Sequence, residues 1–196
     1  MKQKILHLII IFFFLSTNSF SKNLKFTKII DLDKPWGSSF ISNNEIIITE
    51  KSGKIKIVNI KNRNTREINH NLNFLEYGQG GLLDIIYKDG FVWISYTEDR
   101  GNLKTSTSIA KAKFNRKKIF FKNIFQANPP IDSGNHFGSR LAIKDNYIFA
   151  SIGERGQGMI AQDTRSHPGS IIRIHLDGTI PIDNPKFKEK KNWLPE

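Results

Sequence analysis

Short apolar runs alternate with pairs of turn-forming residues along most of the chain. The runs are three to eight residues long and rich in Ile, Phe and Val, which favours strands over helices. Turn pairs such as Asn43-Asn44 and Ser52-Gly53 separate them. The first group of runs is FTKII (26–30), SSFIS (38–42), EIIITE (45–50), KIKIVNI (54–60) and TREINH (65–70).

The pattern then recurs twice. A second group contains LLDIIY (82–87), FVWISYTE (91–98), SIAKAKF (108–114) and KIFFKNIF (118–125), and a third contains LAI (141–143), YIFASI (147–152) and SIIRIHL (170–176), with its last outer strand undefined. Each round opens on a glycine beside a polar or aromatic residue, and no amphipathic helix of convincing length follows the N-terminal segment. Repeats of about 40 to 50 residues with four strands each are typical of propeller blades. We therefore expect an all-β fold, a β-propeller to which this chain supplies about three four-stranded blades.

Three blades are too few to close a ring, because a propeller takes about four or more. The sequence leaves two solutions: a missing C-terminal half, or association with another copy. The final residues, Asp183-Asn184-Pro185 and Trp193 to Glu196, resemble a loop that enters a further strand. We therefore expect the N-terminal portion of a longer propeller.

The N-terminus has the layout of a secretory signal peptide. Lys2 and Lys4 precede an apolar stretch at 5–15, and small residues follow at Ser19 and Ser21. The stretch is short for a membrane span, which needs about 20 residues. We expect a signal peptide at 1–21, a propeller domain at 22–196, a periplasmic or secreted location and no stable membrane insertion. The chain has no cysteine, so no disulfide stabilises it in an oxidising compartment.

The formal net charge of +12 raises the question of a nucleic-acid partner. The lysines are scattered among Asn and Ile, and the densest run, KFKEKK at 186–191, lies near the C-terminus. A dispersed positive charge affects solubility and steering and does not define a site. We expect no nucleic-acid partner.

The candidate chemistry lies between Ser133 and Gln157. Two apolar runs split by Lys144-Asp145-Asn146 predict a hairpin whose outer ends meet at one edge of a sheet. His136 and Glu154 would then face each other. A histidine held by a carboxylate is suited to act as a general base near neutral pH. The alternative is a turn histidine bonded to backbone.

Other residues allow two interpretations each. Arg140 either clamps an anionic cofactor or pairs with Glu154, and the amide of Gln79 either projects into a central pocket or belongs to a turn in which only the glycines matter. Trp36 and Trp93 fit packing in the core or between blades. Asp163 fits a turn cap or a cation ligand. No zinc spacing, nucleophile elbow or phosphate loop occurs.

Four segments together resemble one known family, in its order and spacing. They are PWGSSFISNNEIIITEKSGKIKIV, YGQGGLLDIIYKDGFVWISYTE, GNHFGSRLAIKDNYIFASIGERGQ and AQDTRSHPGSIIRIHLDGTIPIDNP, which span about 35–185. The family is the soluble pyrroloquinoline-quinone (PQQ)-dependent aldose sugar dehydrogenases, also called the glucose/sorbosone dehydrogenases. The resemblance implies a six-bladed propeller and an exported quinoprotein that oxidises the anomeric hydroxyl of an aldose to a lactone.

The resemblance also implies the site and its cofactors, PQQ and Ca²⁺. It makes His136 the general base while a hydride passes to PQQ, and Glu154 the residue that orients it. It places Gln79, Asn135 and Arg140 at the cofactor and substrate, and leaves the metal ligands of this chain unknown. An aldose and an electron acceptor are the implied partners.

This chain also departs from the family pattern. Glu154 stands where Asp is common, Ser139 where Gly is common, and Ser166–Ser170 differs from the usual Asn-His-x-Gly-Lys. The family's calcium-binding backbone, cofactor-clamping Lys and Arg residues and R-N-P-Q motif lie beyond this chain. Two alternatives therefore stay open: a non-catalytic exported propeller fragment that binds a sugar or a protein, and, ranked last, a calcium-dependent lactonase.

Overall fold

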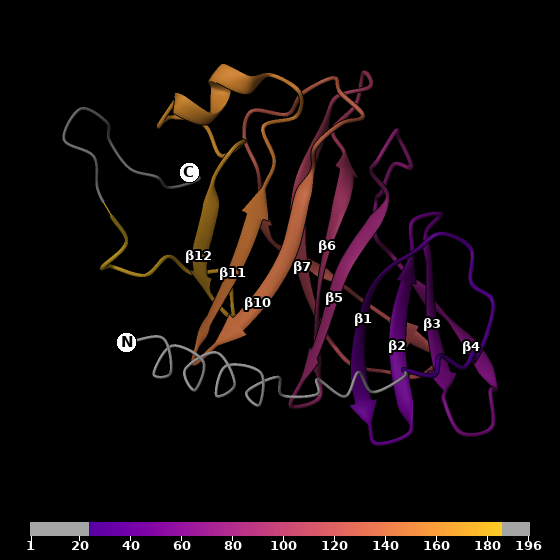
Figure 1. Ribbon diagram of the computed structural model, residues 1–196. Coiled ribbons are helices and arrows are strands. Elements are labelled where there is room, and N and C mark those ends of the chain that lie inside the picture. Colours follow the sequence, from indigo (N-terminus) through magenta and orange to yellow (C-terminus); the bar gives the residue numbers. More distant parts are fainter. Residues whose placement is uncertain (1–23, 186–196) are drawn as a thin grey trace, which may run out of the picture.

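The computed structural model describes residues 24–185 as an assembly of twelve strands and one short 3₁₀ helix, Gly158–Gln162 (Figure 1). The all-β prediction is confirmed. The strands are β1 Pro35–Ser42, β2 Glu45–Glu50, β3 Lys54–Asn59, β4 Thr65–His70, β5 Leu82–Lys88, β6 Phe91–Asp99, β7 Thr105–Lys113, β8 Lys118–Ile119, β9 Lys122–Gln126, β10 Gly138–Lys144, β11 Tyr147–Ile152 and β12 Ile171–His175.

The strands form three sheets that follow one another along the chain. Their orders are β1-β2-β3-β4-β8, β5-β6-β7-β9 and β10-β11-β12. Every neighbouring pair is antiparallel except β4 and β8, which are parallel. The first strand of each sheet lies beside the first strand of the next, with β5 in contact with both β1 and β10 (Figure 1). This is the arrangement of three successive propeller blades around one axis, as the repeats predict.

Three details of the strand prediction are wrong or fall outside the structure. Residues 26–30 form no strand, and the segment 118–125 is two strands rather than one. The first of these, β8, leaves its own sheet and pairs in parallel with β4, while β9 completes the second sheet. A fourth strand of the third sheet is not present within 24–185. The predicted signal peptide at 1–21 and the basic run at 186–191 lie outside the described residues.

The hydrophobic core lies between the sheets. One cluster joins the first and second sheets, with Ile47 and Ile55 against Leu82 and Ile94, and a second joins the second and third sheets. Trp93 belongs to the second cluster, and its indole N–H donates across the interface to the carbonyl oxygen of Leu176 at 3.0 Å. The alternation of inward and outward residues therefore gives each sheet two faces, and successive sheets bury those faces against each other. The predicted packing role of Trp93 is confirmed.

Within residues 24–185 there is no helix of the length and hydropathy that crossing a membrane requires.

Candidate functional site

Three loops meet at one end of the second and third sheets. They are the turn 77–81 before β5, the segment 133–137 before β10, and the loop 153–157 after β11 (Figure 1). Backbone hydrogen bonds connect them: the N–H of Gln79 donates to Gly134 O at 2.7 Å, and the N–H of Gly153 donates to Phe137 O at 3.1 Å. The hairpin register causes this convergence, because Gly138 lies opposite Ile152.

His136 and Glu154 are in direct contact. The imidazole Nδ1 is hydrogen-bonded to Glu154 Oε1, and the same oxygen accepts the N–H of Gly156 at 3.1 Å. The hydrogen bond with His136 is the main reason that the pKa of the Glu154 carboxyl lies below its usual value. An ionised carboxylate on Nδ1 fixes the proton there and leaves Nε2 as the basic nitrogen. The predicted juxtaposition is thus present, and the extra methylene of Glu154 is accommodated.

The side chain of Gln79 holds the backbone of the histidine. Its Oε1 accepts the N–H of His136 at 2.8 Å. His136 has a φ of 48°, in the left-handed region that residues other than glycine adopt only when their surroundings impose it. The amide of Gln79 therefore points at the histidine loop. This differs from both interpretations of Gln79, projection into a central pocket and a turn in which only the glycines matter. Asn135, next to His136, is exposed.

Glycine at 153 is required by the close approach of two loops. A Cβ at this position would lie 1.8 Å from His136 O and 2.5 Å from His136 C. The loop that carries Glu154 can therefore approach the loop that carries His136 only because no side chain separates them.

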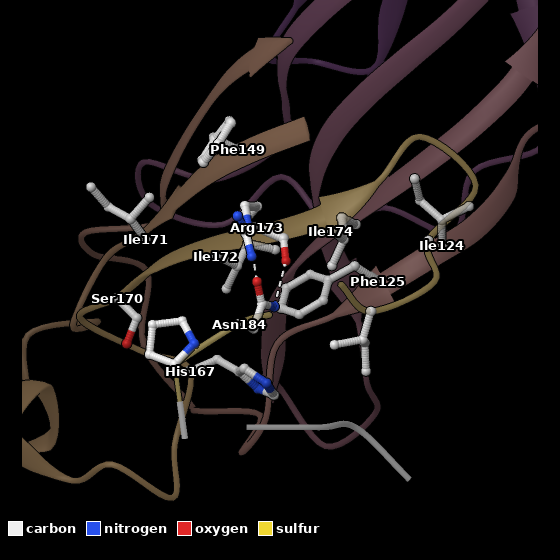
Figure 2. Close-up of a pocket in the computed structure, with 13 residues that line it drawn as sticks. Ile124, Phe125, Phe149, His167, Ser170, Ile171, Ile172, Arg173, Ile174 and Asn184 are labelled. Carbon is white, nitrogen blue, oxygen red and sulfur yellow. Dashed lines mark hydrogen bonds between the residues drawn. The ribbon is translucent and has the colours of Figure 1, made fainter. Parts of the chain in front are cut away.

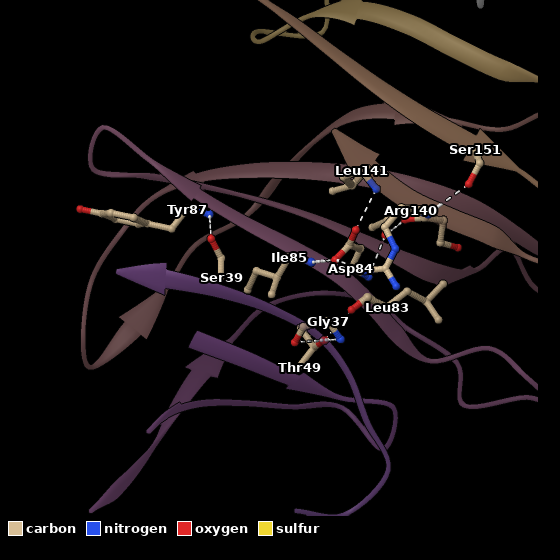
Figure 3. A network of polar contacts seen from close by, with 12 residues as sticks. Gly37, Ser39, Thr49, Leu83, Asp84, Ile85, Tyr87, Arg140, Leu141 and Ser151 are labelled. Atoms are coloured by element: carbon tan, nitrogen blue, oxygen red, sulfur yellow. Dashed lines mark hydrogen bonds and ion pairs between the residues drawn. The ribbon is translucent and has the colours of Figure 1, made fainter. Parts of the chain in front are cut away.

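Arg140 does not pair with Glu154, and that interpretation is wrong. Its Nη1 lies 3.1 Å from Asp84 Oδ1 (Figure 3). Its guanidinium also lies over the ring of Trp36, 4.7 Å from the centroid. Asp84 is 3% exposed and also accepts the N–H of Leu141 at 2.8 Å. Arg140 points away from Glu154 because β10 turns its side chain toward the inner strands of the first and second sheets. There its guanidinium connects all three sheets and keeps a side-chain exposure of 65%.

Arg155 is a site residue that the sequence analysis missed. It is 3% exposed, and its guanidinium donates to main-chain oxygens of the histidine loop. Burial lowers its pKa to about 10. Its position between Glu154 and Gly156 in the loop was the available signal, but hydrophobic periodicity does not show that a charged side chain turns inward.

The remaining candidates have structural contacts. The Asp163 carboxylate accepts the N–H and Nε–H of Arg165 at 3.0 and 3.2 Å, as a turn cap does. No group of three or more His, Cys, Asp or Glu side chains suitable for a metal ion occurs in the part of the chain that the structure describes. In the divergent segment 166–170, His167 is buried and its Nδ1 accepts the N–H of Asn128 at 2.9 Å.

A cavity of about 530 Å³ lies elsewhere, at the outer part of the second and third sheets (Figure 2). Phe125 and Ile124 of the second sheet, Ile172 and Ile174 of β12, and His167 line it. Its lining includes none of the residues of the histidine site. It is an apolar space beside the edge of β12, which has one neighbouring strand within residues 24–185.

Comparisons with known proteins agree with this architecture. The sequence model of the family described as Glucose / Sorbosone dehydrogenase matches residues 32–196. Aldose sugar dehydrogenase YliI of Escherichia coli (strain K12) is 32% identical over 168 residues, which are 81% of this chain and 45% of that protein. Quinoprotein glucose dehydrogenase B of Acinetobacter calcoaceticus is 27% identical, over 80% of this chain and 40% of that protein.

A solved structure gives the same result in three dimensions. The crystal structure of the soluble aldose sugar dehydrogenase from Escherichia coli in the apo-form superposes with a TM-score of 0.75 at 30% identity, covering 81% of this chain and 48% of that one. This chain spans about half the length of the curated relatives that it matches. The family match, the shared blades and the ordered segments lead to one conclusion: the chain belongs to the glucose/sorbosone dehydrogenase family.

Proposed function

We propose that this chain carries the general base of a PQQ-dependent aldose dehydrogenase that oxidises the anomeric hydroxyl of a sugar to a lactone. The observation that supports this most directly is the His136–Glu154 pair, at the meeting point of three loops in a propeller of a sugar dehydrogenase family. One relative is named as an aldose sugar dehydrogenase and another as a quinoprotein.

The exposed donors near the base suit an anionic, planar quinone. Asn135 adjoins His136, and Arg140 follows it by four residues and presents a guanidinium that is largely exposed. A guanidinium is well suited to a carboxylate, which PQQ carries. We assign Arg140 and Asn135 to the cofactor, and Gln79 to the support of the base. When bound, the quinone supplies the hydride acceptor.

The proton step uses residues of this chain alone. His136 Nε2 accepts the proton of the anomeric hydroxyl while the C1 hydride leaves with its electron pair, so that C1 becomes the carbonyl carbon of a lactone. Glu154 stabilises the imidazolium that forms, because its charge lies on the other ring nitrogen. Calcium remains an implication of the family. Two electrons must pass onward to an electron acceptor.

We also propose that the protein is exported to a periplasm or secreted, with residues 1–21 as its signal peptide. The support is the charged, apolar and small-residue layout of that segment, which lies outside the described residues. N-terminal sequencing of the protein from the native cell tests this proposal. A mature N-terminus near residue 22 is expected, and one at Met1 would contradict it.

The catalytic proposal is tested by supplying PQQ and calcium and measuring aldose-dependent reduction of an artificial acceptor. We expect turnover that requires the quinone, and a lactone as product.

Glu154→Gln should lower kcat by about 10²-fold or more, since the neutral amide no longer stabilises the imidazolium. Lys144→Ala, at the opposite end of β10, is the matched control. Saturable sugar or protein binding without turnover would favour the non-catalytic propeller instead.

A further inference from the structure

Arg155 makes an unusual set of contacts beneath the histidine loop. Its Nε donates to Asn135 O at 2.9 Å and its Nη2 donates to Ser133 O. On the other side, Nη1 and Nη2 donate to Thr105 O at 3.1 Å and Thr105 Oγ1 at 2.7 Å. The guanidinium carbon lies 3.7 Å from the centroid of the Phe137 ring. One buried side chain thus contacts the residues on both sides of His136 and ties them to the start of β7.

The acceptors of this cation are all uncharged. No carboxylate is among the hydrogen-bond or ion-pair partners of Arg155 in residues 24–185. Burying a charge is costly unless hydrogen bonds and ring contacts replace its hydration. Ordinary stabilisation of a loop does not need a buried cation, because a neutral donor can bond to a carbonyl. The guanidinium offers something else here, a planar fork that reaches several carbonyls at once.

The loop that it holds needs such a constraint. His136 and Arg155 have φ values of 48° and 61°, so both loops carry a residue in the left-handed region. A backbone of this kind persists only where the surrounding contacts determine it. Gln79 fixes the N–H of His136 from one side, and Arg155 fixes the carbonyls of Asn135 and Ser133 from the other.

We propose that Arg155 is a positioning residue for the general base: it holds the segment 133–137 so that His136 Nδ1 meets Glu154 and Nε2 is presented to the sugar. This inference rests on the proposed role of His136. Arg155 touches neither the substrate nor the cofactor in this account. It acts through the backbone of the loop, while Glu154, its neighbour in sequence, acts on the ring.

The alternative is a purely structural tie between β7 and the loop, so the test needs a signal from the histidine itself. We would record the ring nitrogen resonances of ¹⁵N-histidine-labelled protein by NMR for the wild type, Arg155→Met and Arg155→Lys. The wild type should show His136 with its proton on Nδ1. Arg155→Met should show a mixture of tautomers, and Arg155→Lys, which keeps the charge but loses the fork, should lie between them.

The kinetic part of the test separates positioning from binding. Arg155→Met should lower kcat by about 10²-fold with KM changed only a few-fold, because a displaced base impairs the chemical step more than binding. Arg116→Met is the matched control. Its guanidinium makes a bidentate pair with Glu45 at 2.8 and 2.7 Å in the segment between β7 and β8, outside the three loops of the site, and its loss should leave the His136 resonances unchanged.

Each outcome has a defined consequence. His136 resonances and kcat that match those of Arg116→Met would overturn the proposal. If Arg155→Met does not fold, Arg155→Lys carries the test by the same two measurements. A shifted His136 signal in a protein that oxidises no aldose would support the positioning of the histidine by Arg155 and reject the proposed function.

Discussion

His136 is placed by contacts to its backbone as much as by contacts to its ring. The hairpin between β10 and β11 follows from the two apolar runs and the Lys144-Asp145-Asn146 turn, so the meeting of His136 and Glu154 could be predicted from the sequence. The hydrogen bond from His136 N–H to Gln79 could not, because hydrophobic periodicity fixes which strands pair but not how a loop amide turns.

The close approach at Gly153 gives a sharp residue-scale prediction. Gly153→Ala should push the histidine loop away, because the added Cβ would overlap His136 O. We expect a loss of about 1–3 kcal/mol in the free energy of unfolding, measured by denaturant titration, together with a lower kcat. Gly158→Ala is the control, since no heavy atom lies within 4 Å of its Cβ position. Equal behaviour of the two variants would show that the loops can move apart freely.

His167 predicts how stability depends on pH. Burial lowers its pKa below the ordinary value of 6.5, so the folded state binds this proton less readily than the unfolded state. The stability contributed by neutral His167 is present above pH 6.5 and is lost as the pH falls through the lowered pKa. We expect the thermal midpoint of the wild type to drop more steeply than that of His167→Gln between about pH 7 and about pH 5. Parallel curves would contradict this role.

Among the strands, β8 departs most from the sequence pattern. The run 118–125 predicts one outer strand, yet its first part pairs with β4 of the preceding sheet and only its second part stays in the second sheet. Asn71 explains the detour: its side chain accepts the N–H of Phe121 at 2.7 Å and donates to Phe121 O at 3.0 Å. The side-chain amide of Asn71 thus holds residues 118–121 against the first sheet. The sequence of 118–125 alone does not indicate this pairing.

Asn71→Ala tests this element directly. Loss of both hydrogen bonds should release β8 from the edge of the first sheet and lower the free energy of unfolding by about 1–2 kcal/mol. Denaturant unfolding gives the size of the effect, and faster amide exchange at 118–121 would locate it. Asn73→Ala, which removes one exposed hydrogen bond of 3.2 Å to Asp99 O, should change stability by about 0.5 kcal/mol or less. A similar cost for both variants would remove the special role of Asn71.

At the scale of the whole molecule, the repeat of strand groups predicted three blades, and three sheets around one axis are present. The side-chain contacts between blades near the axis could not be predicted from the sequence in the same way. Pairing with Glu154 was one of two interpretations of Arg140, yet the side chain meets Asp84 and Trp36 from two other blades. Such contacts depend on which side chains the packing of successive blades brings to the axis, and the spacing within one blade does not contain that information.

The part of the propeller that this chain provides determines which steps of the proposed function its residues can carry out. The chain covers 40–48% of the curated relatives, and its described residues include the proposed base, its carboxylate partner and two candidate cofactor contacts. In this account, catalysis depends on His136 whatever completes the remaining side of the quinone. A defect in the base should therefore appear in the chemical step itself and not in the binding of the quinone.

The most direct measurement is a single turnover of the protein loaded with PQQ and calcium. Stopped-flow absorbance would follow reduction of the bound quinone by an aldose in the wild type and in His136→Asn. We predict that the variant binds the quinone with similar affinity but reduces it about 10²–10⁴-fold more slowly, because the proton of the anomeric hydroxyl has no acceptor. Reduction at the wild-type rate in His136→Asn would contradict the assignment of the base.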